Sequence, residues 1–581
     1  MEEYDQAQTP VSPAAYADHD ACSVGFVADL SGRGDHEWLE RGLQALCRLT
    51  HRGAPGDGKG SADGAGILTA IPWALLAREL PSVFATAGHR MAGMCFFPDG
   101  TQALAQPVIE AALEQEGWRF LTWRTVPVDP SCLGEAEGAS APVICQIVGV
   151  HQRAPAAGDA ALDAGLFRAR LRAEARLAAL GLSGVTLASL SLRTIVYKAL
   201  VTPADLPRFY PDLDDAAYAT PFAVFHQRFS TNTFPQWALA QPFRVLAHNG
   251  EINTIGGNRI RMARRQADRA ALPGLPDGIG PLVRATGSDS QSLDDAVDLM
   301  RQAGFSLAQA FARLVPRAWE HDPDVPADEE AFERYQACFS EPWEGPGALA
   351  FADGRQVGAV LDRNGFRPAR LLVTRHGQVC LGSETGIFDV DDADVTLRGR
   401  LGPGEMALVD FASGTLVDNR GVRRALATRH PYRTWVDQAV AVLPATPDEA
   451  PPAPEDAALR LRQRAFGYTA EEIDLIIRPM VEEGKEAVGS MGDDTPLAIL
   501  TSRRRSLGDF FRQRFAQVTN PAIDSLRERK VMALDSFVGR RGNLLTESPE
   551  QARLVHLPSI AIDDACLAAL RGLEQEGLQA A

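Results

Sequence analysis

Asp20-Ala21-Cys22-Ser23-Val24-Gly25-Phe26 joins an acidic leader to the first apolar run of this 581-residue chain. The leader, residues 1–21, contains prolines and several alanines and has no helix or strand periodicity. Such a composition is typical of a disordered terminus or a pro-segment. The leader also lacks the apolar core of a secretory signal. Removal of residues 1–21 would make Cys22 the first residue of the chain.

An N-terminal cysteine has two reactive groups. Its thiol is a nucleophile, and its α-amine has a near-neutral pKa, so the same residue can supply a general base. This combination favours hydrolysis of an amide by an N-terminal nucleophile. A disordered terminus followed by a buried structural cysteine explains the same stretch equally well. Cys22 alone therefore leaves both interpretations open.

Composition narrows the class of protein. Apolar residues make up 45% and charged residues 23% of the chain, and the length allows two to four domains. The net charge of −17 disfavours nucleic-acid binding, and no apolar run is long enough to cross a membrane. The eight cysteines are dispersed without a CxxC pair, so no metal site is predicted. We expect reduced thiols in a cytoplasmic compartment.

Strand and helix patterns occur in runs along residues 22–425. Apolar β-rich segments at 141–150 and 191–197 predict buried strands, and 160–182 has helical spacing. Such runs favour an α+β fold over strict βαβ alternation. A proline-rich acidic segment at 443–456 predicts a linker, and Thr469 to Glu472 forms a capping-box pattern beyond it.

Three downstream segments carry polar groups suited to binding an amino acid. Arg228 follows an apolar run, and a guanidinium there can bind a carboxylate at two points. Asn249 and Gly250 follow another apolar run, and an amide beside a glycine N–H can stabilise an oxyanion. Asp289 supplies a carboxylate for an ammonium group.

Each of these segments also has a structural explanation. Arg228 could be an ordinary surface arginine, and Asn-Gly is a common hairpin turn. The segment 287–290 could cap a helix over 291–302. Together, however, the nucleophile, the oxyanion donors and the two charged groups are what hydrolysis of a glutamine side chain requires.

The chain resembles the N-terminal portion of the large subunit of bacterial glutamate synthase, beginning with its class II glutamine amidotransferase domain. The resemblance rests on long runs that extend nearly from end to end of the sequence. They are 20–26, 51–54, 63–67, 226–233, 242–254, 287–290, 341–346 and 361–368, and, past the linker, 489–497 and 515–524.

The resemblance implies a four-layer αββα N-terminal-nucleophile (Ntn) hydrolase domain and an incomplete α/β central domain. The expected division is a leader at 1–21, the glutaminase domain at 22–425, a linker at 426–456 and part of the central domain at 457–581. Cleavage after Ala21 would expose Cys22 as the nucleophile. Asn249 and Gly250 would stabilise the oxyanion, Arg228 would bind the α-carboxylate of glutamine, and Asp289 would bind its α-amino group.

The family also implies partners and cofactors. Ammonia would pass to a flavin site where 2-oxoglutarate becomes glutamate, with electrons from a reductase subunit or ferredoxin. FMN and a 3Fe–4S cluster are expected only in the part of the family's chain beyond Ala581, so none is expected in this segment. The chain would then be a fragment, a split subunit or a free-standing relative.

One departure from the family and one alternative function remain. Ser23 stands where the family usually has glycine beside the nucleophile, which bears on cleavage after Ala21. The alternative to a glutaminase is a non-catalytic regulatory or partner module that keeps the fold but stays uncleaved.

Overall fold

The computed structural model describes residues 22–53, 63–151, 159–228, 235–267, 279, 281–443, 456–484, 487, 498–507, 510, 525–575 and 578–579. The leader, the central part of the linker and both segments of family resemblance at 489–497 and 515–524 therefore lie outside the described residues. So do Phe229 to Thr233, which follow the candidate residue Arg228.

Two antiparallel sheets pack face to face in the first domain. The larger sheet has seven strands, in the order β14 (Val395–Arg400), β12 (Arg370–Thr374), β13 (Gln378–Gly382), β1 (Ser23–Asp29), β8 (Phe222–Gln227), β2 (Ala65–Ala70) and β7 (Thr194–Ala199). The smaller has five strands, in the order β16 (Thr415–Val417), β15 (Met406–Asp410), β11 (Gln356–Leu361), β10 (Gly347–Ala352) and β9 (Leu246–Gly250).

Strand β1 lies at the centre of the larger sheet and is buried on both faces. Val24, Phe26 and Ala28 point into the apolar layer between the two sheets. Val27 points the other way, into the core under helix α1 (His36–Arg48). Side chains alternate between the two faces of a strand, so the apolar run after Cys22 can fill both layers.

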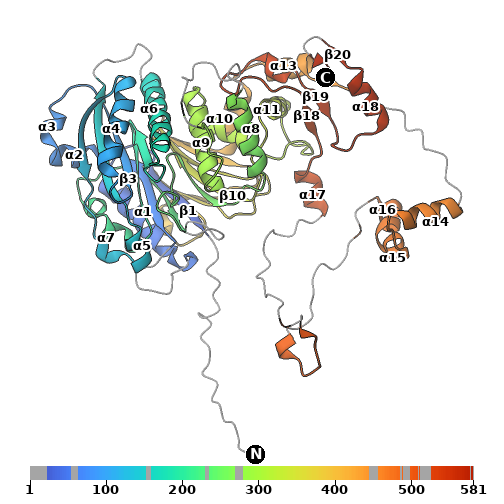
Figure 1. The fold of residues 1–581 in the computed structure, drawn as a ribbon, viewed down its shortest axis with the longest axis horizontal. Coiled ribbons are helices and arrows are strands. Elements are labelled where there is room, and N and C mark those ends of the chain that lie inside the picture. The colour runs from blue at the N-terminus through green and yellow to red at the C-terminus, as the bar shows by residue number, and fades with distance from the viewer. Residues whose placement is uncertain are drawn as a thin grey trace, which may run out of the picture.

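Helices cover the outer face of each sheet. The outer face of the smaller sheet packs against a group of helices that follow β9 in the sequence. They are α8 (Ile255–Ala267), α9 (Asp289–Gln302), α10 (Leu307–Leu314), α11 (Ala327–Phe339), α12 (Asn419–Ala427) and α13 (Tyr432–Ala439). With α1 on the larger sheet, the layers run helix, sheet, sheet, helix, as expected. Figure 1 shows α8 to α11 in green, to the right of β1.

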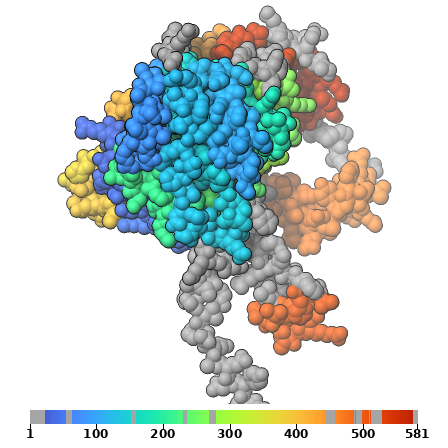
Figure 2. All heavy atoms as spheres, turned by 60° about the vertical axis from the view of Figure 1, so that its left-hand side comes forward, coloured from blue at the N-terminus to red at the C-terminus, as the bar shows by residue number. Residues whose placement is uncertain are grey.

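A third, four-stranded sheet extends this arrangement. Its strands are β4 (Arg119–Thr125), β5 (Val143–His151), β3 (His89–Phe97) and β6 (Thr186–Ser191), and helices α4 (Gln102–Gln115) and α6 (Asp159–Ala179) cover it. The predicted strand at 141–150 and helix at 160–182 correspond to β5 and α6. Figure 2 shows this blue and cyan part of the chain forming one face of the molecule. The remaining short helices of the domain are α2 (Trp73–Glu79), α3 (Pro81–Phe84), α5 (Glu135–Ala139) and α7 (Leu206–Phe209).

The segment after the linker packs partly on the first domain. Strand β17 (Ala441–Val442) pairs in parallel with β19 (Val555–Leu557), which also pairs with β18 (Ser536–Val538). Glu547 accepts hydrogen bonds from Arg313 of α10 at 3.0 Å and from the Tyr432 hydroxyl of α13 at 3.2 Å. The other elements of this segment are α14 (Asp456–Ala465), α15 (Ala470–Glu472), α16 (Arg478–Glu483), α17 (Ser525–Val531), α18 (Asp564–Arg571), β20 (Glu574–Gln575) and β21 (Leu578–Gln579).

Two local expectations can be compared with these elements. The capping box at Thr469 is confirmed, because its hydroxyl accepts from the Glu472 N–H and the Glu472 carboxylate accepts from the Thr469 N–H. The domain boundary expected at residue 425 stays a prediction, and it falls inside α12.

Candidate active site

Cys22 immediately precedes β1, where the antiparallel pairing of β1 and β8 brings the start of one strand to the end of the other. Ser23 pairs with Gln227, so Arg228, the next residue along, lies beside Cys22. Gly25 sets the close packing of this strand. A Cβ at Gly25 would lie 2.5 Å from the Leu381 carbonyl oxygen and 2.6 Å from the Phe225 ring, so only glycine fits.

Charged groups surround the Cys22 thiol. Burial raises the pKa of Cys22 to about 11, and the guanidinium groups of Arg228 and Arg367 oppose that shift by favouring the thiolate. The carboxylates of Asp63 and Asp289 add to the rise. The thiol therefore lies within electrostatic reach of two cations and two anions, while Cys22 is still joined to Ala21 and has no free α-amine.

Arg228 is a buried arginine held in an unusual backbone conformation. Its φ is 73°, in the left-handed region that costs a non-glycine residue about 1–3 kcal/mol. Its N–H donates to the Gly64 carbonyl at 2.9 Å, and its Nε lies 3.2 Å from Asp63 Oδ2. The interpretation of Arg228 as a surface arginine is wrong, because its side chain is only 6% exposed.

Asn249 and Gly250 end strand β9 and do not form a turn. They pair with Ala348 and Gly347 of β10, so the hairpin-turn interpretation of Asn-Gly is wrong. Contacts between β9 and both β1 and β8 bring this strand to the Cys22 side of the domain. A Cβ at Gly250 would lie 2.0 Å from the Pro346 carbonyl oxygen, which explains why the position requires glycine.

The side-chain amide of Asn249 is buried, and its hydrogen bonding is unusual. The residue is 1% exposed, and neither Oδ1 nor Nδ2 has a partner among the residues that the structure describes. Leaving a buried amide unpaired costs roughly 1–3 kcal/mol. Groups of this kind are expected where a ligand supplies the missing partner.

Asp289 is the first residue of α9, and the cap is Ser288, whose side chain accepts from the Gln291 N–H. The helix expected over 291–302 thus begins two residues earlier, because Ser288 has the extended backbone of a cap. Asp289 Oδ2 accepts from the Ile252 N–H at 2.8 Å, and Oδ1 accepts from the Ser290 N–H at 2.6 Å. These bonds hold the carboxylate beside the loop that follows Gly250.

Sequence reasoning missed two charged neighbours of the thiol. Asp63 pairs with Arg228, and Arg367 lies in the loop between β11 and β12. Both belong to segments that carry the family resemblance, but no spacing links either residue to Cys22. A charged residue directly before Gly64 or after the glycine turn at Gly365 was the available signal.

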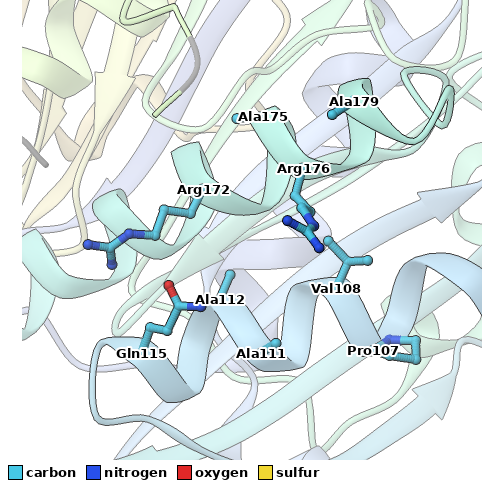
Figure 3. A pocket seen from close by; sticks show the side chains of 9 residues that line it. All are labelled: Pro107, Val108, Ala111, Ala112, Gln115, Arg172, Ala175, Arg176 and Ala179. Atoms are coloured by element: carbon cyan, nitrogen blue, oxygen red, sulfur yellow. The ribbon is translucent and has the colours of Figure 1, made fainter. Parts of the chain in front are cut away.

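Metal binding and membrane insertion can also be judged for the described residues. No group of three or more His, Cys, Asp or Glu residues in the described ranges could hold a metal ion. Among the same residues, no helix is both long and apolar enough to span a bilayer. A cavity of about 680 Å³ between α4 and α6, whose lining includes Arg172, Arg176 and Val108, shares no residue with the cluster at Cys22 (Figure 3).

Comparison with curated proteins finds relatives that are much longer than this chain. The chain is 40% identical over 571 residues to the glutamate synthase [NADPH] large chain of Azospirillum brasilense, covering 95% of this chain and 37% of that protein. It is 41% identical over 578 residues to the ferredoxin-dependent glutamate synthase 2 of Synechocystis, covering 96% and 36%. The chain therefore spans little more than a third of the length of these relatives.

Solved structures give weaker similarity. A solved structure of the allosteric regulatory enzyme of purine biosynthesis matches with a TM-score of 0.31 and 14% identity, over 67% of this chain and 47% of that one. The glutamine phosphoribosylpyrophosphate amidotransferase from B. subtilis matches with a TM-score of 0.25 and 14% identity, over 57% and 48%.

Family comparison covers most of the sequence. Residues 461–581 match the glutamate synthase central domain. Residues 22–435 match the family described as "Glutamine amidotransferases class-II", and the match begins at Cys22. The chain belongs to the class-II glutamine amidotransferases.

Proposed function

We propose that the domain beginning at Cys22 hydrolyses the side-chain amide of glutamine with Cys22 as the nucleophile. The main support is the charge pattern around the thiol. A cation, Arg228, and an anion, Asp289, both act on Cys22, and free glutamine has one carboxylate and one ammonium group to bind. Family membership supports the same reaction class.

The reaction requires removal of residues 1–21, which frees the α-amine of Cys22. The amine accepts the thiol proton, and the thiolate attacks the amide carbon of the glutamine side chain. The amine then returns the proton to the leaving nitrogen, ammonia departs, and a γ-glutamyl thioester remains on Cys22. Water cleaves the thioester, giving glutamate and restoring the thiol.

The other residues have separate roles in this proposal. The Asn249 side-chain N–H and the Gly250 main-chain N–H stabilise the oxyanion of the tetrahedral intermediate. Arg228 binds the substrate α-carboxylate, and Asp289 binds the α-ammonium group. Asn249 suits this role because its buried amide has no partner in the described residues.

We further propose that the ammonia serves the synthesis of glutamate from 2-oxoglutarate. Support comes from the match of residues 461–581 to the glutamate synthase central domain and from the names of the relatives. The reductive step would use a flavin domain, on the same or another polypeptide, with FMN and a 3Fe–4S cluster. Because one relative is named for NADPH and the other for ferredoxin, we propose a reductase subunit or ferredoxin as the electron-donating partner.

Replacement of the nucleophile tests the proposal. Cys22→Ser should abolish glutaminase turnover, measured as glutamate released from glutamine. Cys47 is a partly buried cysteine in α1, and Cys47→Ser is the matched control, which should keep turnover. Equal activity of Cys22→Ser and the parent chain would overturn the proposal.

Two further variants separate binding from turnover. Asn249→Ala should lower kcat by about 10²–10³-fold, as expected for loss of one oxyanion donor. Arg228→Ala should instead raise KM, since it leaves the substrate carboxylate unpaired. The expected loss of binding free energy is roughly 2–5 kcal/mol. The role of Asn249 is wrong if Asn249→Ala raises KM and leaves kcat intact.

A further inference from the structure

Strand β9, which carries Asn249, is an edge strand of the five-stranded sheet. The outward main-chain groups of an edge strand have no neighbouring strand to pair with. At His248 the buried side chain of Gln241 takes that place. The His248 N–H donates to Gln241 Oε1 at 2.7 Å, and Gln241 Nε2 donates to the His248 carbonyl oxygen at 3.2 Å.

A histidine of the other sheet contacts the same carbonyl. His226 lies in β8, and its Nε2 is 3.1 Å from the His248 carbonyl oxygen. A carbonyl only accepts hydrogen bonds, so the proton of the His226 ring must be on Nε2. Burial lowers the pKa of His226 to about 3, which keeps the ring neutral. His226 of the larger sheet and Gln241 of the loop before β9 therefore both bond the main chain directly before Asn249.

The His248 side chain extends this contact to α9. Its Nδ1 lies 2.9 Å from Ser290 Oγ, and Ser290 Oγ donates to Asp289 Oδ1 at 3.1 Å. A hydroxyl has one proton, so Ser290 accepts from His248 Nδ1–H while it donates to the carboxylate. Asp289 is also bound by the Ile252 N–H at 2.8 Å, from the loop after Gly250.

From these contacts we infer that Gln241, His248 and Ser290 are positioning residues that set the spacing between the Asn249 amide and the Asp289 carboxylate. Among the residues that the structure describes, none bonds the Asn249 side chain, so we take its place to depend on the main chain of β9. The inference rests on the proposed function, in which Asn249 acts on the oxyanion and Asp289 on the substrate ammonium group.

The decisive variant is Gln241→Leu, which removes both bonds to His248 while keeping a similar volume. We expect kcat for glutamine to fall about 10- to 100-fold, since a shift of about 1 Å in a catalytic group has that effect, and KM to change little. Gln241→Glu keeps the acceptor for the His248 N–H but turns a second acceptor oxygen toward the His248 carbonyl oxygen, so kcat should fall in this variant as well.

Gln146→Leu is the matched control. Gln146 is also a buried amide with two partners, Arg124 at 2.9 Å and the Tyr197 hydroxyl at 2.7 Å, but it lies in β5 of the four-stranded sheet. Its loss should lower the urea midpoint of unfolding and leave kcat unchanged. This separates a general loss of stability from misplacement of Asn249.

Ser290→Ala tests the other end of the network. Asp289 loses the hydroxyl donor and His248 loses its partner, so we expect KM for glutamine to rise by a larger factor than kcat falls. We thus expect mainly kcat to change in Gln241→Leu and mainly KM to change in Ser290→Ala. A merely structural role would not produce this difference between the two variants.

The outcomes distinguish this inference from the proposed function. Wild-type kcat in folded Gln241→Leu, or an equal fall in Gln146→Leu, overturns the inference. If Gln241→Leu does not fold, Gln241→Glu decides in the same way, because unchanged kcat and KM would contradict a positioning role. A parent chain without glutaminase activity, or one unaffected by Cys22→Ala, overturns the proposed function instead.

Discussion

At the scale of single residues, the state of Cys22 depends on whether the leader is attached. Burial raises the thiol pKa to about 11 despite the nearby guanidinium groups. At neutral pH the thiol of the uncleaved chain is therefore almost entirely protonated. An adjacent free α-amine would add a proton acceptor that this state lacks.

The raised pKa predicts slow alkylation of Cys22 in the chain that retains residues 1–21. The thiolate is the reactive form, so the rate should rise about tenfold per pH unit from pH 7 to beyond pH 9. Mass spectrometry of the Cys22 peptide after short iodoacetamide pulses measures the rate, with the urea-unfolded chain as control. A rate that levels off below pH 9 would contradict this pKa.

Ser23 gives a second prediction at this scale. Its hydroxyl is fully buried and has no partner among the described residues. Ser23→Ala should therefore raise the free energy of unfolding by about 1–3 kcal/mol, the cost of an unpaired buried polar group. Urea denaturation measures the change.

Ser383→Ala is the matched control for Ser23→Ala. The Ser383 hydroxyl is also buried, but it accepts from the Val24 N–H and donates to the Val24 carbonyl, both at 3.1 Å. Its removal should destabilise the fold. Stability changes of the same sign in the two variants would argue against the unpaired state of Ser23.

At the scale of elements, the contact between β8 and β9 should make the fold sensitive to acid. The pKa of His226 is about 3 in the fold and 6.5 ordinarily. Between these values the unfolded chain binds a proton that the folded chain does not, so stability falls as pH drops below 6.5. The slope from this one group is about 1.4 kcal/mol per pH unit.

His226→Gln removes that titration and keeps an amide donor for the His248 carbonyl. Relative to the parent chain, its free energy of unfolding should rise by about 1.4 kcal/mol for each pH unit lowered from 6.5. Urea denaturation at pH 6.5, 5.5 and 4.5 tests this. A constant difference across the series would show that His226 does not resist protonation.

Elements were predicted well where burial alone sets the pattern. The apolar run at 141–150, predicted as a buried strand, corresponds to β5, whose residues are buried on both faces along most of its length. Asn249-Gly250 resembles a turn in sequence but lies in a strand. Gly250 is needed because the Pro346 carbonyl oxygen approaches closely, and the Asn249 amide is buried and unpaired among the described residues. Such tertiary causes leave no local signal.

At the scale of the molecule, the order of the strands within each sheet could not be predicted from periodicity. Strand β1 pairs with β8 and β13, about 200 and 350 residues away in sequence. The αββα arrangement was expected from the family resemblance. Cys22, Arg228, Asn249 and Asp289 were candidates from their sequence surroundings, and the resemblance implied the same roles. Asp63 and Arg367 were missed because only the folded chain brings them to the thiol.

The most direct test of an N-terminal nucleophile is covalent capture at Cys22. The reagent is a glutamine analogue whose side-chain amide is replaced by a chloromethyl ketone, and the protein is the full chain beginning at Cys22. Peptide mass spectrometry should find one adduct, on Cys22, that excess glutamine prevents and that the chain retaining residues 1–21 does not form. Full glutaminase activity with residues 1–21 attached, or capture at another cysteine with Cys22 unmodified, would contradict the account.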